Sequence, residues 1–424
     1  MNHYSLNSTP ADMDAADPLR GFRHEFYLPT FDDGKPQIYF VGNSLGLQPI
    51  KTAELLNEEL ENWRRFGVRG HFLGRFPWMP YHEFLTSTMA FLIGARDEEV
   101  VMMNSLTTNL HLMMATFYRP AGKKRKIMIE GHAFPSDHYA VESQIRWHGL
   151  EPKDSMLVLQ PEPGCESLSM DRICEIIASD ADELALIILP GVQYYTGQVF
   201  DIARLTEVAH RHKVLIGFDL AHAAGNLRMQ LHDWGPDFAV WCSYKYLNGG
   251  PGSVGGCFVH KRHVANPDLP RLAGWWGHNK QTRFRMGNEF EPIPTAEGWQ
   301  LSNPPILSLA AIRASLDVFR RAGGMEPLTD KSRAMNELFR RLLRERLAGK
   351  VEILTPENGG CQLSLKVVAR EISGKSVKEQ LDLSGIETDW REPNVIRAAP
   401  VPLYNQFQEI EFFVNRLVEI LGSP

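Results

Sequence analysis

The chain has 424 residues, 43 % of them hydrophobic and 23 % charged, which is ordinary for globular proteins. Its 45 Lys and Arg against 51 Asp and Glu give a net charge of −6, which excludes a general basic field for nucleic acid or an anionic membrane. The five cysteines are scattered and form no C-x-x-C pair, so neither a disulfide framework nor a zinc site is indicated. We therefore expect small molecules and further copies of the chain as partners.

The length predicts a large domain with a smaller one. Residues 1–18 contain three aspartates and no apolar core of a leader sequence, and no later stretch is as long as a membrane-spanning helix. We expect an unprocessed cytoplasmic protein. The expected division is an N-terminal segment at 1–50, a large domain at 51–305, and a small C-terminal domain at 306–424 to which the N-terminal segment contributes.

Short apolar runs alternate with helical patterns through the middle of the chain. Runs that are apolar throughout are typical of strands covered on both faces. They occur at 99–103, 126–129, 156–159, 185–189, 214–218, 238–242 and 256–259. The stretch 202–212, with Asp201 as its N-cap, has the spacing of a helix between parallel strands. The large domain is therefore predicted to be α/β with a mostly parallel, seven-stranded type of sheet.

The pattern changes after Ser302-Asn303-Pro304-Pro305. Helical patterns follow at 309–321 and 335–347, and a last amphipathic segment runs from 406 to 421. Alternating runs at 351–354 and 362–368 predict strands. This part is predicted to be a smaller α+β domain.

Two loops that follow predicted strands offer groups for an anion and for an aromatic ring. Residues 104–109 lead into a helical pattern, so their amides and hydroxyls are placed to hold a phosphate, although plain Ser/Thr capping explains them as well. Residues 132–138 place Phe134 beside Ser136 and Asp137. The histidines of this loop lack H-E-x-x-H spacing, and no metal is expected.

A lysine and an aspartate carry the most specific signal. Asp219 ends the run 214–218, where open α/β sheets place ligands, and a protonated pyridine nitrogen is a suitable partner for a buried carboxylate. A capping aspartate is the plain alternative. Lys245 lies between an apolar run and a glycine-rich turn, where it is able to form an imine with a carbonyl cofactor. Together they predict pyridoxal 5′-phosphate (PLP) and amino-acid chemistry.

Two further motifs need separate interpretation. Residues 250–255 match G-x-G-x-x-G, but a strand pattern follows them instead of the helix that a dinucleotide site requires. Arg397 lies in the otherwise uncharged run 393–400 and suits bidentate capture of a carboxylate. A surface salt bridge is the alternative for this arginine.

Several blocks resemble those of kynureninases, PLP-dependent enzymes of fold type I in the aspartate aminotransferase superfamily. The blocks are 40–49, 134–137, 217–222, 241–249, 274–278, 301–305 and 399–405. They extend over nearly the whole chain. One position departs from the family pattern: Pro190 stands where a hydroxyl residue is frequent, and it puts one minor cofactor contact in doubt because proline has no N–H to donate.

The resemblance implies a homodimer with a shared active site that hydrolyses the Cβ–Cγ bond of L-kynurenine, 3-hydroxy-L-kynurenine or both, giving an anthranilate and L-alanine. Such a hydrolase serves tryptophan catabolism and NAD biosynthesis. It also implies that Lys245 forms the imine and removes the Cα proton, that Asp219 keeps the pyridine ring protonated, and that Tyr244 protonates the Cβ carbanion. The other implied cofactor contacts are Leu106, Thr107, Phe134, Ser136, Asp137, His222, Trp275 and Asn303, the last two from across the dimer interface. The implied substrate contacts are Arg397, His71, Ser44, Tyr195, His278, Ser302 and Asn303.

Two alternatives stay open on the sequence. The first is another PLP enzyme, either an aminotransferase or a cysteine desulfurase. A desulfurase needs a mobile nucleophilic cysteine, whereas Cys242 and Cys257 lie in strand patterns. The second is a non-catalytic protein of the same fold, which has no need of Lys245 and Asp219. Within the first interpretation, polar residues near the substrate ring lead to the hypothesis that 3-hydroxykynurenine is turned over at least as well as kynurenine.

Overall fold

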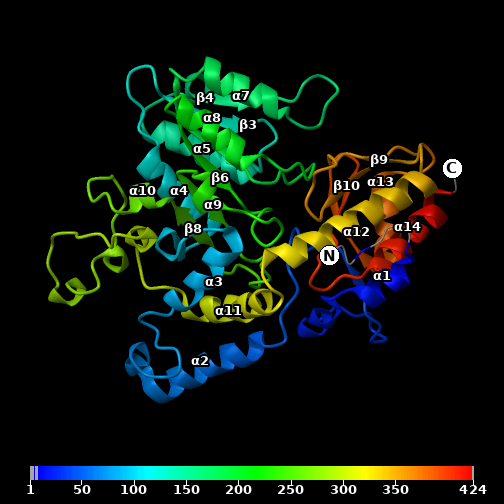
Figure 1. Cartoon of the computed structure of the whole chain (residues 1–424), viewed down its shortest axis with the longest axis horizontal. Coiled ribbons are helices and arrows are strands. Elements are labelled where there is room, and N and C mark those ends of the chain that lie inside the picture. The colour runs from blue at the N-terminus through cyan, green and yellow to red at the C-terminus, as the bar shows by residue number, and fades with distance from the viewer. Residues whose placement is uncertain (1–3, 5–7, 423–424) are drawn as a thin grey trace.

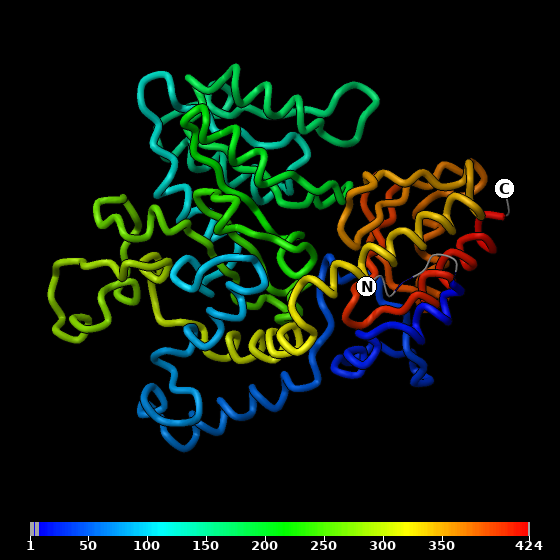
Figure 2. Tube along the Cα trace, in the orientation of Figure 1, coloured from blue at the N-terminus to red at the C-terminus, as the bar shows by residue number. Residues whose placement is uncertain are grey.

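The computed structural model describes residue 4 and residues 8–422, so residues 1–3 and 5–7 of the expected N-terminal segment lie outside the described part. The chain forms a large body and a smaller one, and the first and last of its helices, α1 (Pro10–Ala16) and α14 (Phe407–Leu421), both lie in the smaller body (Figures 1 and 2). None of the helices within the described ranges combines the length and the apolar character needed to cross a membrane.

A seven-stranded sheet forms the centre of the large body. Its strands are β2 (Val100–Met102), β3 (Lys126–Glu130), β4 (Met156–Leu159), β5 (Leu184–Pro190), β6 (Leu215–Asp219), β7 (Phe238–Trp241) and β8 (Gly256–Val259), in the order β2-β8-β7-β6-β5-β3-β4. Strands β3 to β7 pair in parallel, and β8 is antiparallel to both its neighbours. The seven predicted strands and the mostly parallel sheet are confirmed.

Both faces of this sheet are buried, which explains why its strands are apolar throughout. Ile187 and Leu189 of β5 belong to one core, and Leu186 and Ile188 belong to the core on the other face. The covering helices are α2 (Thr52–Phe66), α3 (Glu83–Ile93), α4 (Leu106–Phe117), α5 (Pro135–Trp147), α6 (Pro152–Ser155), α7 (Met170–Ser179), α8 (Ile202–Arg211), α9 (Leu231–Trp234), α10 (Lys261–Val264) and α11 (Ile306–Arg321). Asp201 caps α8 as predicted, because its side chain accepts from the amide of Arg204.

The smaller body has an antiparallel sheet in the order β12-β13-β10-β9. Its strands are β9 (Val351–Ile353), β10 (Leu363–Val367), β12 (Asp389–Arg391) and β13 (Val395–Ala398), while β1 (Ile38–Tyr39) pairs in parallel with β11 (Ile386–Glu387). Its helices are α1 (Pro10–Ala16), α12 (Met325–Arg346), α13 (Gly374–Leu383) and α14 (Phe407–Leu421). The predicted strands at 351–354 and 362–368 and the last helix are confirmed, and the helix expected from 335 begins earlier, at Met325.

The N-terminal segment is bound into the smaller body. Asp14 caps α14 by accepting from the amides of Phe407 and Gln408 at 2.7 and 3.0 Å. Asp17 forms a buried ion pair of 2.8 Å with Lys331 of α12.

Helix α12 links the two hydrophobic cores. Met325 and Leu328 at its start belong to the core of the large body, and Leu338 and Phe339 belong to that of the smaller one. Helix α11 packs against α2 and α3 in the large body. The change from one core to the other thus falls within α12, later in the chain than residue 305, after which the division was predicted.

Short 3₁₀ helices complete the fold. They are η1 (Arg20–Glu25), η2 (Gly67–His71), η3 (Asp97–Glu99), η4 (Trp275–Gly277), η5 (Arg283–Arg285) and η6 (Ala296–Trp299).

Candidate active site

A cavity of about 310 Å³ lies at the carboxyl ends of the central strands. Glu130, Pro190 and Asp219, the last residues of β3, β5 and β6, all line it, as expected for a ligand site in an open α/β sheet. It brings together these predicted site residues: Ser44, Leu106, Thr107, Phe134, Ser136, Asp137, Asp219, His222, Tyr244, Lys245 and Arg397.

The amine of Lys245 is held by a neutral histidine. Its Nζ lies 2.9 Å from Nε2 of His222. Burial, and then the positive charges of Lys245, Arg397 and Arg391, lower the pKa of His222 well below its usual range. The unprotonated Nε2 therefore accepts a hydrogen bond from Lys245, while Nδ1 has no partner in the described part of the chain. The rings of Phe134 and Tyr244 are each centred 6.0 Å from Nζ.

The backbone of Lys245 is fixed by a close approach of the N-terminal turn. The amide of Gly46 donates to the carbonyl of Tyr244 at 2.8 Å, and the amide of Asn248 donates to that of Lys245 at 2.9 Å. Asn248 is left-handed, with φ of 52°. A Cβ on Gly46 would lie only 2.3 Å from the carbonyl oxygen of Lys245. Only glycine fits at this contact.

Three carboxyl groups gather opposite the lysine. Burial raises the pKa of Glu130 to about 8, and the charge of Asp219 adds to this effect. Burial, followed by the charge of Asp219, also raises the pKa of Asp137. Asp219 accepts hydrogen bonds from the Asp137 side chain and from the amide of Ala221 at 2.7 Å. We infer that Asp137 keeps its proton and that Asp219, although burial raises its own pKa, is the carboxylate that meets a cationic ligand group.

The N-terminus of α4 faces the same cavity. Its N-cap, Ser105, makes no side-chain capping bond, so the first amides of the helix are not satisfied by that side chain. The hydroxyls of Thr107 and Ser136 lie 2.9 Å apart beside it. Buried Asn109 donates to the carbonyls of Met103, just after β2, and of Gly256 in β8, and so fastens the helix to the central sheet. Free amides and hydroxyls at one end of a cavity suit a phosphate group.

Arg397 enters the cavity from the smaller body. Its side chain is 1 % exposed, and Nη1 donates to the carbonyl of Tyr194 at 2.6 Å. Nη2 bonds to Asp389, and Nε has no partner among the described residues. The alternative of a surface salt bridge is therefore wrong, because the ion pair that Arg397 makes is buried.

The remaining predicted site residues do not line this cavity of the single chain. His71 packs edge-on against Trp78, with ring centres 5.4 Å apart, and Tyr195 borders a neighbouring hollow. Trp275 is 41 % exposed and His278 bonds to Thr282 at 3.0 Å. Ser302 and Asn303 are exposed. Their roles stay predictions.

Four polar residues of the cavity lining were not predicted as site residues: Asn43, Glu130, Tyr194 and Arg391. Tyr194 precedes the predicted Tyr195, and its ring meets Phe134 edge-on at 5.3 Å. Glu130 ends a predicted strand just as Asp219 does, and this position could have identified it as a site residue from the sequence. Arg391 reaches the cavity from β12, a strand that was not predicted.

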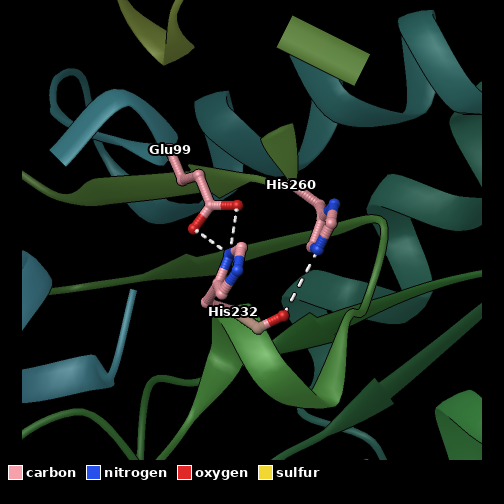
Figure 3. Close-up of side chains that lie close together, drawn as sticks. All are labelled: Glu99, His232 and His260. Carbon is pink, nitrogen blue, oxygen red and sulfur yellow. Dashed lines mark hydrogen bonds and ion pairs between the residues drawn. The ribbon is translucent and has the colours of Figure 1, made fainter. Parts of the chain in front are cut away.

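Several histidines outside the cavity belong to hydrogen-bonded clusters. His232 donates from Nδ1 to Glu99 at 2.9 Å, and its ring stacks on that of His260 (Figure 3). Both ring nitrogens of His260 are engaged, with the carbonyl of His232 and the amide of Arg262. We interpret this cluster as a structural link between the segments that carry it. His210, in the last turn of α8, is bonded at 3.0 Å to buried Asp237.

The cysteines considered for desulfurase chemistry are buried. Cys242 directly follows β7 and Cys257 lies within β8. Burial raises the pKa of both thiols, so neither is a ready thiolate nucleophile.

The fold and the lysine–aspartate pair define the class, which is that of PLP-dependent enzymes of fold type I. Among solved structures, a C-DES mutant with glycine covalently linked to its PLP cofactor has a TM-score of 0.76 at 17 % identity, over 94 % of this chain and 99 % of that one. The cysteine desulfurase CsdA of Escherichia coli has a TM-score of 0.74 at 16 % identity, over 98 % and 99 %. At such low identity these likenesses show the fold alone.

Sequence relatives give the family. The kynureninase of Koribacter versatilis is 50 % identical over 97 % of this chain and 97 % of its own, and that of Myxococcus xanthus is 52 % identical over 96 % and 95 %. Residues 328–417 match the model of the kynureninase C-terminal domain. The chain belongs to the kynureninase family.

Proposed function

We propose that the protein is a PLP-dependent hydrolase that converts L-kynurenine, 3-hydroxy-L-kynurenine or both to an anthranilate and L-alanine. One observation carries the proposal in addition to the family relationship. A single cavity holds an amine, a buried carboxylate, an open helix N-terminus and a buried arginine, from residues 245, 219, 106 and 397. These are the groups that an amino-acid substrate and this cofactor need.

The residues of the cavity fit PLP. Asp219 suits the ring nitrogen because it is buried and forms no ion pair with any of the described residues, and Phe134 offers a ring face at the cavity wall. Thr107, Ser136 and the amides at the start of α4 suit the phosphate. Lys245 suits the aldehyde. When bound, PLP supplies an electron sink for a carbanion.

Three side chains would carry the proton transfers and the orientation of the substrate. Lys245, hydrogen-bonded to the neutral imidazole of His222, would accept the proton from the substrate Cα. Burial raises the pKa of Tyr244, so its hydroxyl keeps its proton and is suited to deliver it to the substrate Cβ after bond cleavage. Arg397 would hold the α-carboxylate through its Nε, which has no partner among the described residues. Water must reach the side-chain ketone, because the cleavage is a hydrolysis.

The family relationship also supports a cytoplasmic homodimer. Exposed apolar side chains cluster in the segment that carries Trp275: Phe284, Met286 and Phe290. Trp275 and Asn303 lie outside the cavity of their own chain, and the partner's copies would complete the site. Sedimentation of the holoenzyme tests the dimer. Mixing an inactive Lys245 variant with an inactive Trp275 variant tests the sharing of the site, because regained activity requires Lys245 from one chain and Trp275 from the other.

The activity test is release of L-alanine from kynurenine and from 3-hydroxykynurenine by the purified holoenzyme. L-cysteine serves as the comparison substrate, with sulfide as its product, because it separates this proposal from a desulfurase. Lys245→Ala should remove nearly all alanine release and the visible absorbance of lysine-bound cofactor while the fold is retained. Sulfide from cysteine without alanine from either kynurenine would contradict the proposal.

A further inference from the structure

The hairpin that carries Arg397 presents two more charged side chains on the same face. Strands β12 and β13 are antiparallel, and their register places Asp389 directly opposite Arg397. Arg391 lies two residues beyond Asp389 on β12, so its side chain emerges on the same side of the sheet. Both arginines line the cavity. Sequence spacing and strand register together bring a D-x-R pair to the carboxylate end of the site.

One carboxylate oxygen holds both guanidinium groups. Oδ2 of Asp389 accepts from Nη2 of Arg397 and lies 3.1 Å from Nη2 of Arg391. The Asp389 side chain is 11 % exposed, which limits screening by water. Two cations against one anion leave a single positive charge at this end of the cavity. A monoanionic ligand balances that charge.

Each of the two arginines has a hydrogen-bond donor that is unpaired among the described residues. The Nε atoms of Arg391 and Arg397 are buried, and neither has a hydrogen-bond partner within the described part of the chain. A buried guanidinium donor without a partner is costly, and a planar carboxylate is the group that satisfies two such donors at once. The charge of Arg391 also acts inside the cavity, since it contributes with Lys245 and Arg397 to the lowered pKa of His222.

We propose that Arg391 is a second guanidinium contact for the α-carboxylate of the substrate, and that Asp389 is the positioning residue that aligns Arg391 with Arg397. The inference rests on the proposed function, because the ligand is the carboxylate of an L-amino acid substrate. Asp389 acts through the two arginines. Its negative charge reduces their combined charge to a net charge of +1 at the place where the substrate carboxylate binds. The site is thereby matched to one carboxylate.

The first experiment compares ligands with and without the carboxylate in the holoenzyme. The dissociation constants of L-alanine and L-alaninamide follow from the change in visible absorbance of the lysine-bound cofactor. Arg391→Gln should weaken L-alanine about tenfold and raise KM for kynurenine to a similar extent, with kcat within about threefold. L-Alaninamide should change by less than about twofold, because it lacks the charge that Arg391 recognises.

The matched control removes a positive charge from the same sheet without touching the cavity. Lys366 lies on β10 opposite Val395, in register with Arg391 across β13, and it borders the neighbouring hollow. Lys366→Gln should leave both dissociation constants within about twofold, since only the long-range field changes.

Asp389→Asn tests the positioning role with a readout other than stability. Removal of its charge leaves two uncompensated guanidinium groups, so a dianion gains more than a monoanion. Inhibition by succinate should improve at least about threefold relative to inhibition by propionate, while KM for kynurenine rises. An Asp389 with a merely structural role would weaken both inhibitors equally.

Three results would overturn the inference. In Arg391→Gln, equal losses for L-alanine and L-alaninamide would show that Arg391 does not read the carboxylate. A loss of bound PLP with unchanged L-alanine affinity would assign Arg391 to the cofactor instead. In Asp389→Asn, an unchanged succinate-to-propionate ratio would refute the charge limit. Wild-type turnover of kynurenine is measured first, so that a failure of the proposed function is recognised separately.

Discussion

Replacement of Gly46 by alanine should lower turnover although Gly46 is not expected to touch the substrate. A Cβ at this position would lie 2.3 Å from the carbonyl oxygen of Lys245 and 2.8 Å from Cα of Asn248. Both atoms belong to the backbone, so an ordinary contact distance requires the turn at Gly46 or the Lys245 segment to move by about 1 Å. A displacement of that size at a catalytic group costs on the order of 10²-fold in rate. We therefore expect kcat to fall by about 10²-fold.

The assay is steady-state release of alanine together with the absorbance of the lysine-bound cofactor. Stability should fall by about 1–3 kcal/mol, as for other overpacked sites, so the variant should fold and bind PLP. Gly21→Ala is the matched control, because no heavy atom lies within 4 Å of its added Cβ. A Gly46→Ala enzyme with wild-type kcat would refute the argument that this contact fixes Lys245.

Three further perturbations follow from the structure. Asp219→Ala should lose PLP readily, at a cost of about 2–5 kcal/mol in cofactor binding, whereas near-normal activity would show that the buried carboxylate has another purpose; bound PLP after gel filtration is the measure. Asp237→Asn should lower the thermal midpoint by removing about 2–4 kcal/mol from the free energy of unfolding. Burial alone would raise the pKa of Asp237, but its hydrogen bonds with histidines hold that pKa well below its usual range. The loss of stability should therefore be full above about pH 4 and should shrink as the pH falls below that value. His71→Trp combined with Asn303→Thr should shift preference toward kynurenine, and specificity constants for both substrates decide this; a strong wild-type preference for unsubstituted kynurenine would end the hypothesis.

The strands of the large body were predictable because each is a short and mainly apolar run. The reversal of β8 was not, since an apolar run carries no sign of its direction. Likewise, β12 escaped because Asp389, Trp390 and Arg391 form a strand of only three residues with two charges. The pattern of apolar residues therefore predicts which segments are buried better than it predicts which strands pair and in which direction.

The same limit applied to the site. Asp219 and Lys245 were found because a polar residue after a buried strand has few inexpensive structural explanations. Gly46 meets the Lys245 segment, and Tyr194 reaches the cavity, only because the fold brings distant segments together: the amide of Gly46 bonds to the carbonyl of Tyr244, and the carbonyl of Tyr194 accepts from Arg397. No local spacing in the sequence encodes those contacts.

Helix α12 constrains how this chain is able to change in length during evolution. It enters one hydrophobic core at Met325 and leaves through the other near Leu343. An inserted or deleted residue between them would turn everything that follows by about 100°, and would carry the apolar stripe of the distal half toward solvent. Length differences among relatives should therefore avoid 325–346 and collect in surface loops, such as the exposed turn at 161–167.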